Sequence, residues 1–192
     1  SDAAIEIARQ AKITHDNTLE ESFLTDVFMA RLWLLLGRVS AASDYAHTSV
    51  EFRSILSHEP AQPNLSPDNV QPELYGSDIR DIWSEVPLLT AIRLRLAQGR
   101  LDGILQLLEK ICGDAEKKEW TSILIEALIL KALVLNAEGK LAQALRTLQQ
   151  VLAIAKKEGY VRVFVDEGLP MFSLLQRAAS RGISEQYVSK LM

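Results

Sequence analysis

The sequence is poor in cysteine and lacks a long uninterrupted apolar run. Its single cysteine, Cys112, excludes an internal disulfide framework and suits a reducing compartment. The most apolar segment, 123–135, is 13 residues long and contains Glu126 and Lys131, whereas a membrane-spanning helix needs about 20 apolar residues. This segment therefore predicts a buried helix and no membrane span. We also expect a cytoplasmic location, because the N-terminus shows no basic segment followed by an apolar core.

An excess of positive charge is also missing. The 192 residues include 21 Lys and Arg against 25 Asp and Glu, which gives a net charge of −4. A chain of this charge is not expected to contact nucleic acid directly. The hydrophobic content of 48% and charged content of 24% are those of a folded globular protein.

Catalytic and metal-binding motifs are absent from the sequence. It contains no glycine-rich phosphate loop, no Gly-x-Gly-x-x-Gly and no serine elbow. His15, His47 and His58 are far apart, and with one cysteine they form no metal-ligand spacing. Asp166 and Glu167 are adjacent and would point about 100° apart on a helix, which makes a shared acid/base site difficult. We expect no enzyme, no metal and no cofactor in this segment.

The sequence does contain an internal repeat. Segment 97–120 matches segment 137–160 after a shift of 40 positions, which places Gly99 on Gly139. A fixed period of this length is typical of helical repeat arrays. Glycine suits a turn between two helices because it adopts positive φ without a Cβ clash. The repeat predicts an all-α fold, an α–α superhelix of antiparallel helix pairs like a tetratricopeptide (TPR) array.

Apolar periodicity predicts helices along most of the chain. The expected helices are 3–13, 19–36, 38–57, 78–98, 101–112, 121–138, 141–157, a short one ending at Gly168, one starting with Pro170 and ending at Gly182, and a last one capped by Ser184. Segment 58–77 holds four of the six prolines and predicts a surface loop. We expect a single domain over 1–192 with about four helix pairs, as a fragment of a larger protein.

Segment 160–168 allows two interpretations. Its alternating valines favour a strand by local propensity. The shift of 40 positions instead places it on the helix that starts at Thr121. We follow the repeat and predict a short helix.

Four residues are candidates for contact with a ligand or partner. Arg31 and Arg93 each lie six residues before the turn glycine of their pair, on first helices, which line the concave surface of a stacked array. The equivalent residue of the next pair is Leu133, so an arginine is not present at this position in every pair. The alternative role for the two arginines is simple solvation or a structural salt bridge. Glu126 and Asn136 complete the candidate set.

The chain resembles a known family over nearly its whole length. Segment 84–175, the phrase GYVRVFVDEGLPMFSLL at 159–175 and segment 37–46 are similar to the helical-repeat region of MalT-like, LuxR-type large ATP-binding bacterial regulators. The resemblance implies that ATP binds an N-terminal module outside this segment, and that DNA binds a helix-turn-helix after Met192. It also implies that this segment receives a small-molecule inducer or a regulatory protein and mediates self-association, leaving a homo-oligomer open.

A free-standing TPR adaptor that grips a peptide is the alternative function. Such an adaptor would carry a regular ladder of Lys, Arg and Asn on successive first helices, and Leu133 interrupts that ladder.

Overall fold

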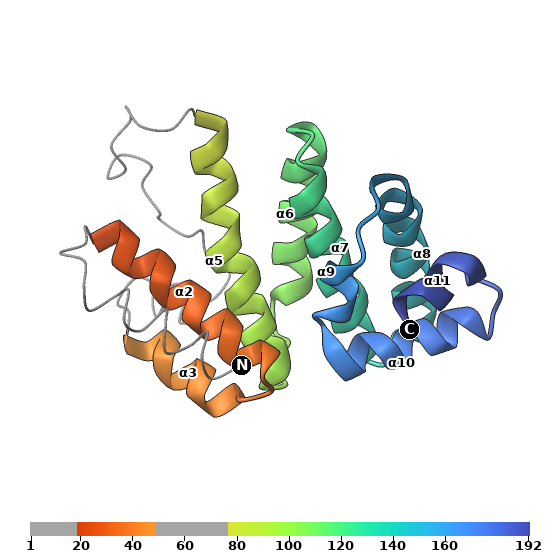
Figure 1. Ribbon diagram of the computed structural model, residues 1–192, viewed down its shortest axis with the longest axis horizontal. Helices are drawn as coiled ribbons and strands as arrows, with labels where there is room; N and C mark the ends of the chain where they lie inside the picture. The colour runs from red at the N-terminus through yellow and green to blue at the C-terminus, as the bar shows by residue number, and fades with distance from the viewer. Residues whose placement is uncertain (1–18, 49–76) are drawn as a thin grey trace. The chain divides into compact units, whose positions relative to one another are not determined.

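The computed structural model describes residues 19–48 and 77–192, with side chains over 25–47 and 85–192. The described residues form α-helices joined by turns, with no strand among them (Figure 1). The predicted all-α fold is therefore confirmed. The helix expected at 3–13, the end of the helix expected at 38–57 and the proline-rich loop up to residue 76 lie outside the described residues.

The chain divides into two compact units between Arg100 and Leu101. Each unit is described by itself, and the single domain expected over 1–192 stays a prediction.

The first unit contains three described helices. These are α2 (Leu19–Leu35), α3 (Val39–Thr48) and α5 (Ser77–Ala97). Helix α2 packs against both α3 and α5. Mostly small side chains fill this contact, which lets the helices approach closely. Its buried members are Val27, Ala30, Ala42, Ala46, Ala91 and Leu94.

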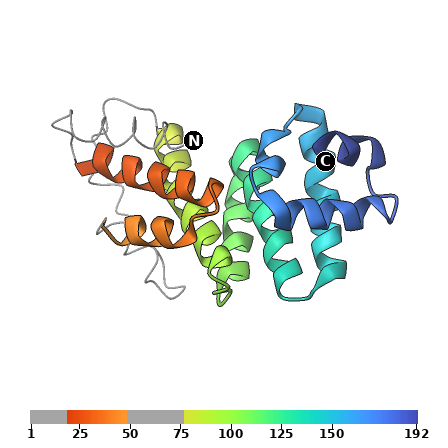
Figure 2. The ribbon, with the colours of Figure 1, turned by 60° about the horizontal axis from the view of Figure 1, so that its bottom comes forward.

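The second unit is built around α7. Its helices are α6 (Ile104–Lys117), α7 (Thr121–Ala137), α8 (Leu141–Glu158), α9 (Arg162–Val165), α10 (Gly168–Ala179) and α11 (Glu185–Leu191). Helices α6 and α8 both pack against α7 (Figure 2), and α10 contacts it as well. This packing explains why the sequence of α7 is apolar on nearly every side.

Two helix starts differ from the prediction by more than one residue. Helix α6 begins at Ile104 and not at Leu101, because Gly103 adopts a left-handed φ of 72° directly before it. Helix α10 begins at Gly168, so Pro170 is its third residue and not its first. Proline is tolerated there because the N–H groups of a first turn have no partner within the helix.

The short helix predicted to end at Gly168 is present as α9, but it ends at Val165. Its Phe164 is fully buried and meets the ring of Tyr187 on α11 edge to face, with ring centroids 6.3 Å apart. The Tyr187 hydroxyl donates a hydrogen bond to the carbonyl oxygen of Tyr160. Helical packing thus overrides the strand propensity of the valines. Ser184 holds the cap position of α11 as predicted, but its side chain makes no capping hydrogen bond.

The turn glycines predicted from the repeat adopt one geometry. Their φ angles are 70° at Gly37, 71° at Gly99 and 77° at Gly139. At Gly99 the glycine N–H donates to the carbonyl oxygen of Leu96 at 3.0 Å, and the next N–H donates to that of Arg95 at 2.9 Å. The other two turns repeat both bonds. These bonds satisfy carbonyls that a helix end would otherwise leave without a partner.

Glu119 adopts the same conformation without being glycine. Its φ is 57°, and the following N–H, that of Trp120, donates to the carbonyl oxygen of Ala115 at 2.9 Å. The equivalent residue 40 positions on is Gly159, with a φ of 74°. A side chain in the left-handed region costs about 1 kcal/mol or more.

Replacing Glu119 by glycine should therefore stabilise the chain. We expect Glu119→Gly to raise the free energy of unfolding by about 0.5–1 kcal/mol, because relief of the backbone strain exceeds the entropy that glycine adds to the unfolded chain. Urea unfolding measures the change. Glu116→Gly inside α6 removes the same charge at an ordinary helical position and should destabilise by about 1 kcal/mol. Equal destabilisation by both changes would contradict the prediction.

Cys112 lies on the buried face of α6. Cys112 is 8% exposed. Burial raises the pKa of the Cys112 thiol from 9.0 to about 11, while the nearby positive charge of Lys131 lowers that pKa by a smaller amount. The thiol is therefore protonated in the folded chain at neutral pH and is a poor nucleophile.

The raised pKa of Cys112 makes stability fall in alkali. The thiol ionises near pH 9 in the unfolded chain and near pH 11 in the folded chain. The contribution of the protonated thiol to the free energy of unfolding is therefore complete below pH 9 and is lost as the pH rises through 11. Cys112→Ala should reduce the drop in the free energy of unfolding between about pH 8 and about pH 10.5. Urea titrations of both proteins measure this drop, and an identical drop would exclude the thiol as its source.

Candidate functional site

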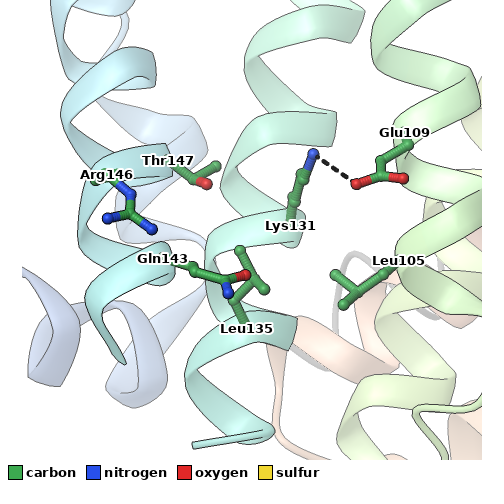
Figure 3. Close-up of a pocket in the computed structure, with 7 residues that line it drawn as sticks. All are labelled: Leu105, Glu109, Lys131, Leu135, Gln143, Arg146 and Thr147. Atoms are coloured by element: carbon green, nitrogen blue, oxygen red, sulfur yellow. Dashed lines mark ion pairs between the residues drawn. The ribbon is translucent and has the colours of Figure 1, made fainter. Parts of the chain in front are cut away.

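A pocket of about 270 Å³ opens over α7 between α6 and α8 (Figure 3). We name it the α6–α8 pocket. It is lined by Leu105 and Glu109 of α6, Lys131 and Leu135 of α7, and Gln143, Arg146 and Thr147 of α8. Its lining is mixed, with two leucines, two cations, one carboxylate, one amide and one hydroxyl.

Helical spacing brings these side chains together. Leu105 and Glu109 are four residues apart on α6, and Lys131 and Leu135 are four apart on α7. Residues at this spacing share one face of a helix. Each helix therefore presents one apolar and one charged group to the pocket, and α8 adds the remaining polar groups from a single turn.

An ion pair crosses the pocket between α7 and α6. The Lys131 Nζ lies 3.3 Å from the Glu109 Oε1 (Figure 3), with side chains 24% and 62% exposed. A pair this exposed contributes little stability, about 0–1 kcal/mol. It can therefore be replaced at small cost by a ligand anion that offers Lys131 an equivalent partner.

The opposite wall carries a second cation. Arg146 is exposed on α8, and Figure 3 shows it beside Thr147 and Gln143. With Lys131 and Glu109, the lining has one net positive charge in a chain whose net charge is −4. The arrangement suits a small polar molecule that bears an acidic group, with the amide and hydroxyl available for hydrogen bonds.

The predicted arginines belong to the first unit and not to this pocket. Arg93 on α5 is 6% exposed and Arg31 on α2 is half-buried. Each takes part in a polar or electrostatic interaction within the chain. A buried guanidinium requires such compensation. Ligand or partner contact by either arginine stays a prediction.

Glu126 and Asn136 lie on α7 but on another side from the pocket. Each is five residues from Lys131, which places it about 140° around the helix axis. Asn136 Oδ1 accepts a hydrogen bond from the Arg177 side chain of α10 at 3.3 Å. Glu126 is half-buried and has an interaction partner. None of the four predicted residues lines the pocket, and their contact with a ligand or partner stays a prediction.

Sequence reasoning missed the pocket's charged residues. One signal was available, because Lys131 is the single basic residue of α7, whose other side chains are mostly apolar. Its neighbours Glu109 and Arg146 are 22 and 15 positions away in the sequence. Only the packing of three helices brings them together.

The described residues form no candidate metal site. Among them, no group of three or more His, Cys, Asp and Glu side chains is placed to hold an ion. Within the same part of the chain, no helix is both long and apolar enough to cross a membrane.

Comparison with known proteins identifies the family. The family model described as the MalT-like TPR region matches residues 1–181. Comparisons with curated proteins and with solved structures found no match. The match covers nearly the whole chain and agrees with the helix pairs and turns described above. The chain therefore belongs to the family of the MalT-like TPR region.

Proposed function

We propose that the chain is the signal-receiving segment of a LuxR-type, ATP-dependent bacterial transcriptional regulator and acts by binding, without catalysis. The family match over residues 1–181 is the observation that carries this proposal. The sequence has no glycine-rich phosphate loop, so its residues do not fit ATP. ATP binding and DNA binding are assigned to other segments of the parent protein.

We assign the α6–α8 pocket to a small-molecule effector. Its volume of about 270 Å³ lies near the lower end of the roughly 300–1,000 Å³ found for small-molecule sites. An acidic group on the effector would lie between Lys131 and Arg146. The carbon skeleton of the effector would contact Leu105 of α6 and Leu135 of α7.

Binding would change the balance of forces among three helices. An anion held by both Lys131 and Arg146 links α7 to α8 and competes with Glu109 of α6 for Lys131. The effector then favours one spacing of these helices over others. In a stacked array, a small change at one helix pair alters the curvature of the whole. The parent protein's other modules respond to that shift in population.

A free-standing TPR adaptor is the alternative from another class. A TPR-like fold supports protein interaction in either case. The coding sequence that follows residue 192 separates the two functions, since a helix-turn-helix there supports the regulator and a stop codon supports the adaptor.

A thermal-shift experiment on the chain tests the pocket assignment. The probes are succinate and glucose 6-phosphate, with glucose as the uncharged match. We expect at least one anionic probe to raise Tm, because at about one hundred times Kd a ligand stabilises by about 2.7 kcal/mol, or roughly 5–10 °C for a chain of this size.

Two substitutions and a control locate the effect. Lys131→Gln and Arg146→Gln should each reduce the Tm shift by half or more, because each removes one charge partner of the anion. Lys156→Gln removes an exposed charge of α8 outside the pocket and should leave the shift unchanged. An equal shift with glucose, an equal loss in all three variants, or no shift with either anion would contradict the assignment.

A further inference from the structure

The ion pair between Lys131 and Glu109 limits which anions the α6–α8 pocket can accept. The Lys131 Nζ and the Glu109 Oε1 are 3.3 Å apart, so a ligand carboxylate that reaches Lys131 also comes close to the Glu109 carboxylate. Two carboxylates at such a separation repel each other. A ligand that carries only negative charge therefore gains a contact with Lys131 but pays for it with repulsion from Glu109.

A ligand with an ammonium group next to its carboxylate avoids this repulsion. Its carboxylate pairs with Lys131 while its ammonium pairs with Glu109, so both members of the ion pair exchange one partner for another. An α-amino acid has this arrangement, because a single carbon atom joins its ammonium and carboxylate groups. Hydrogen bonds between charged groups are also the stronger ones in proteins.

The exposure of the two side chains suits such an exchange. Glu109 is 62% exposed, so its carboxylate can turn toward a ligand ammonium without leaving solvent. Lys131 is 24% exposed and is held more firmly by the surrounding helices. The existing pair contributes little stability at this exposure, and its replacement by two new pairs costs the chain little.

Arg146 adds a third charge from a different helix. It is exposed on α8, whereas Glu109 lies on α6 and Lys131 on α7 (Figure 3). Two cations and one carboxylate in the lining complement a ligand with two carboxylates and one ammonium. At neutral pH this is the charge pattern of aspartate and glutamate. We propose that the effector of the α6–α8 pocket is an acidic α-amino acid, an inference that rests on the assignment of this pocket to an effector.

The remaining groups of the lining agree with such a ligand. Leu105 and Leu135 offer apolar contact to its methylene carbons. Gln143 and Thr147 lie within four residues of Arg146 on α8 and share its face of the helix. Their amide and hydroxyl can donate hydrogen bonds to the carboxylate that Arg146 binds. The volume of about 270 Å³ suits a molecule smaller than the drug-sized ligands of most surveyed pockets.

Isothermal titration calorimetry of the whole chain tests the proposal with matched ligands. L-Aspartate and L-glutamate are compared with succinate and glutarate, which have the same carbon skeletons and carboxylates but lack the ammonium. We expect at least one amino acid to bind at least about fivefold more tightly than its diacid, because it gains an exposed ion pair and avoids a like-charge contact. The N-acetylated amino acids, which lack the positive charge, should show no such preference.

Glu109→Gln should change the affinities of the two kinds of ligand in opposite directions. The amino acid loses the carboxylate that binds its ammonium, so its Kd should rise at least about threefold. The diacid no longer competes with Glu109 for Lys131, so its Kd should fall. General damage to the pocket would instead weaken both ligands. Glu116→Gln removes an exposed carboxylate of α6 outside the lining and should leave every Kd unchanged.

The outcomes separate this proposal from the assignment of the pocket. Equal binding by amino acids and diacids, with both weakened by Lys131→Gln, would overturn the ammonium contact and leave the pocket assignment standing. A preference for the amino acid that survives Glu109→Gln would also overturn the proposal, because the ammonium would then bind elsewhere. Absence of binding by all four ligands overturns it as well, whatever glucose 6-phosphate shows for the pocket.

Discussion

The hydrogen bond from the residue after a left-handed turn residue back to the carbonyl five positions earlier sets the architecture of the α7–α8 pair. At Gly139 it joins the Lys140 N–H to the Leu135 carbonyl oxygen at 2.8 Å. This bond ends one helix and aims the next one back along it. Once the turn is fixed, the faces that the two helices present to each other are fixed as well, because the side-chain period of a helix is constant.

Burial after the turns follows from this constraint. Five residues beyond the turn glycines lie Ala42, Ile104, Ala144 and Tyr187, which are 0%, 0%, 0% and 6% exposed. Nine residues beyond lie Ala46, Leu108, Leu148 and Leu191, with the same exposures. Side chains at these places range from alanine to tyrosine. The position relative to the turn, more than the identity of the side chain, therefore decides which residues become core.

The sequence predicts the features that the turn geometry controls. The glycine period predicts the turns, the helix pairs and the short helix α9 against its own strand propensity. It fails where a second local signal intervenes, as at Gly103, which delays α6, and at Gly168, which starts α10 before Pro170. It also fails for contacts between helices. The burial of Arg93 and the meeting of Lys131, Glu109 and Arg146 depend on packing that no local spacing contains.

The break between α9 and α10 explains why an apolar surface is left open in the last pair. Helix α7 is one continuous rod of 17 residues. The corresponding part of the last pair is divided into α9 of 4 residues and α10 of 12, at a glycine with a φ of 65°. The division lets Phe164 turn inward to meet Tyr187, while Leu169 in the first turn of α10 is left 82% exposed. The backbone bend that completes the core of the second unit thus also leaves Val165 and Leu169 exposed.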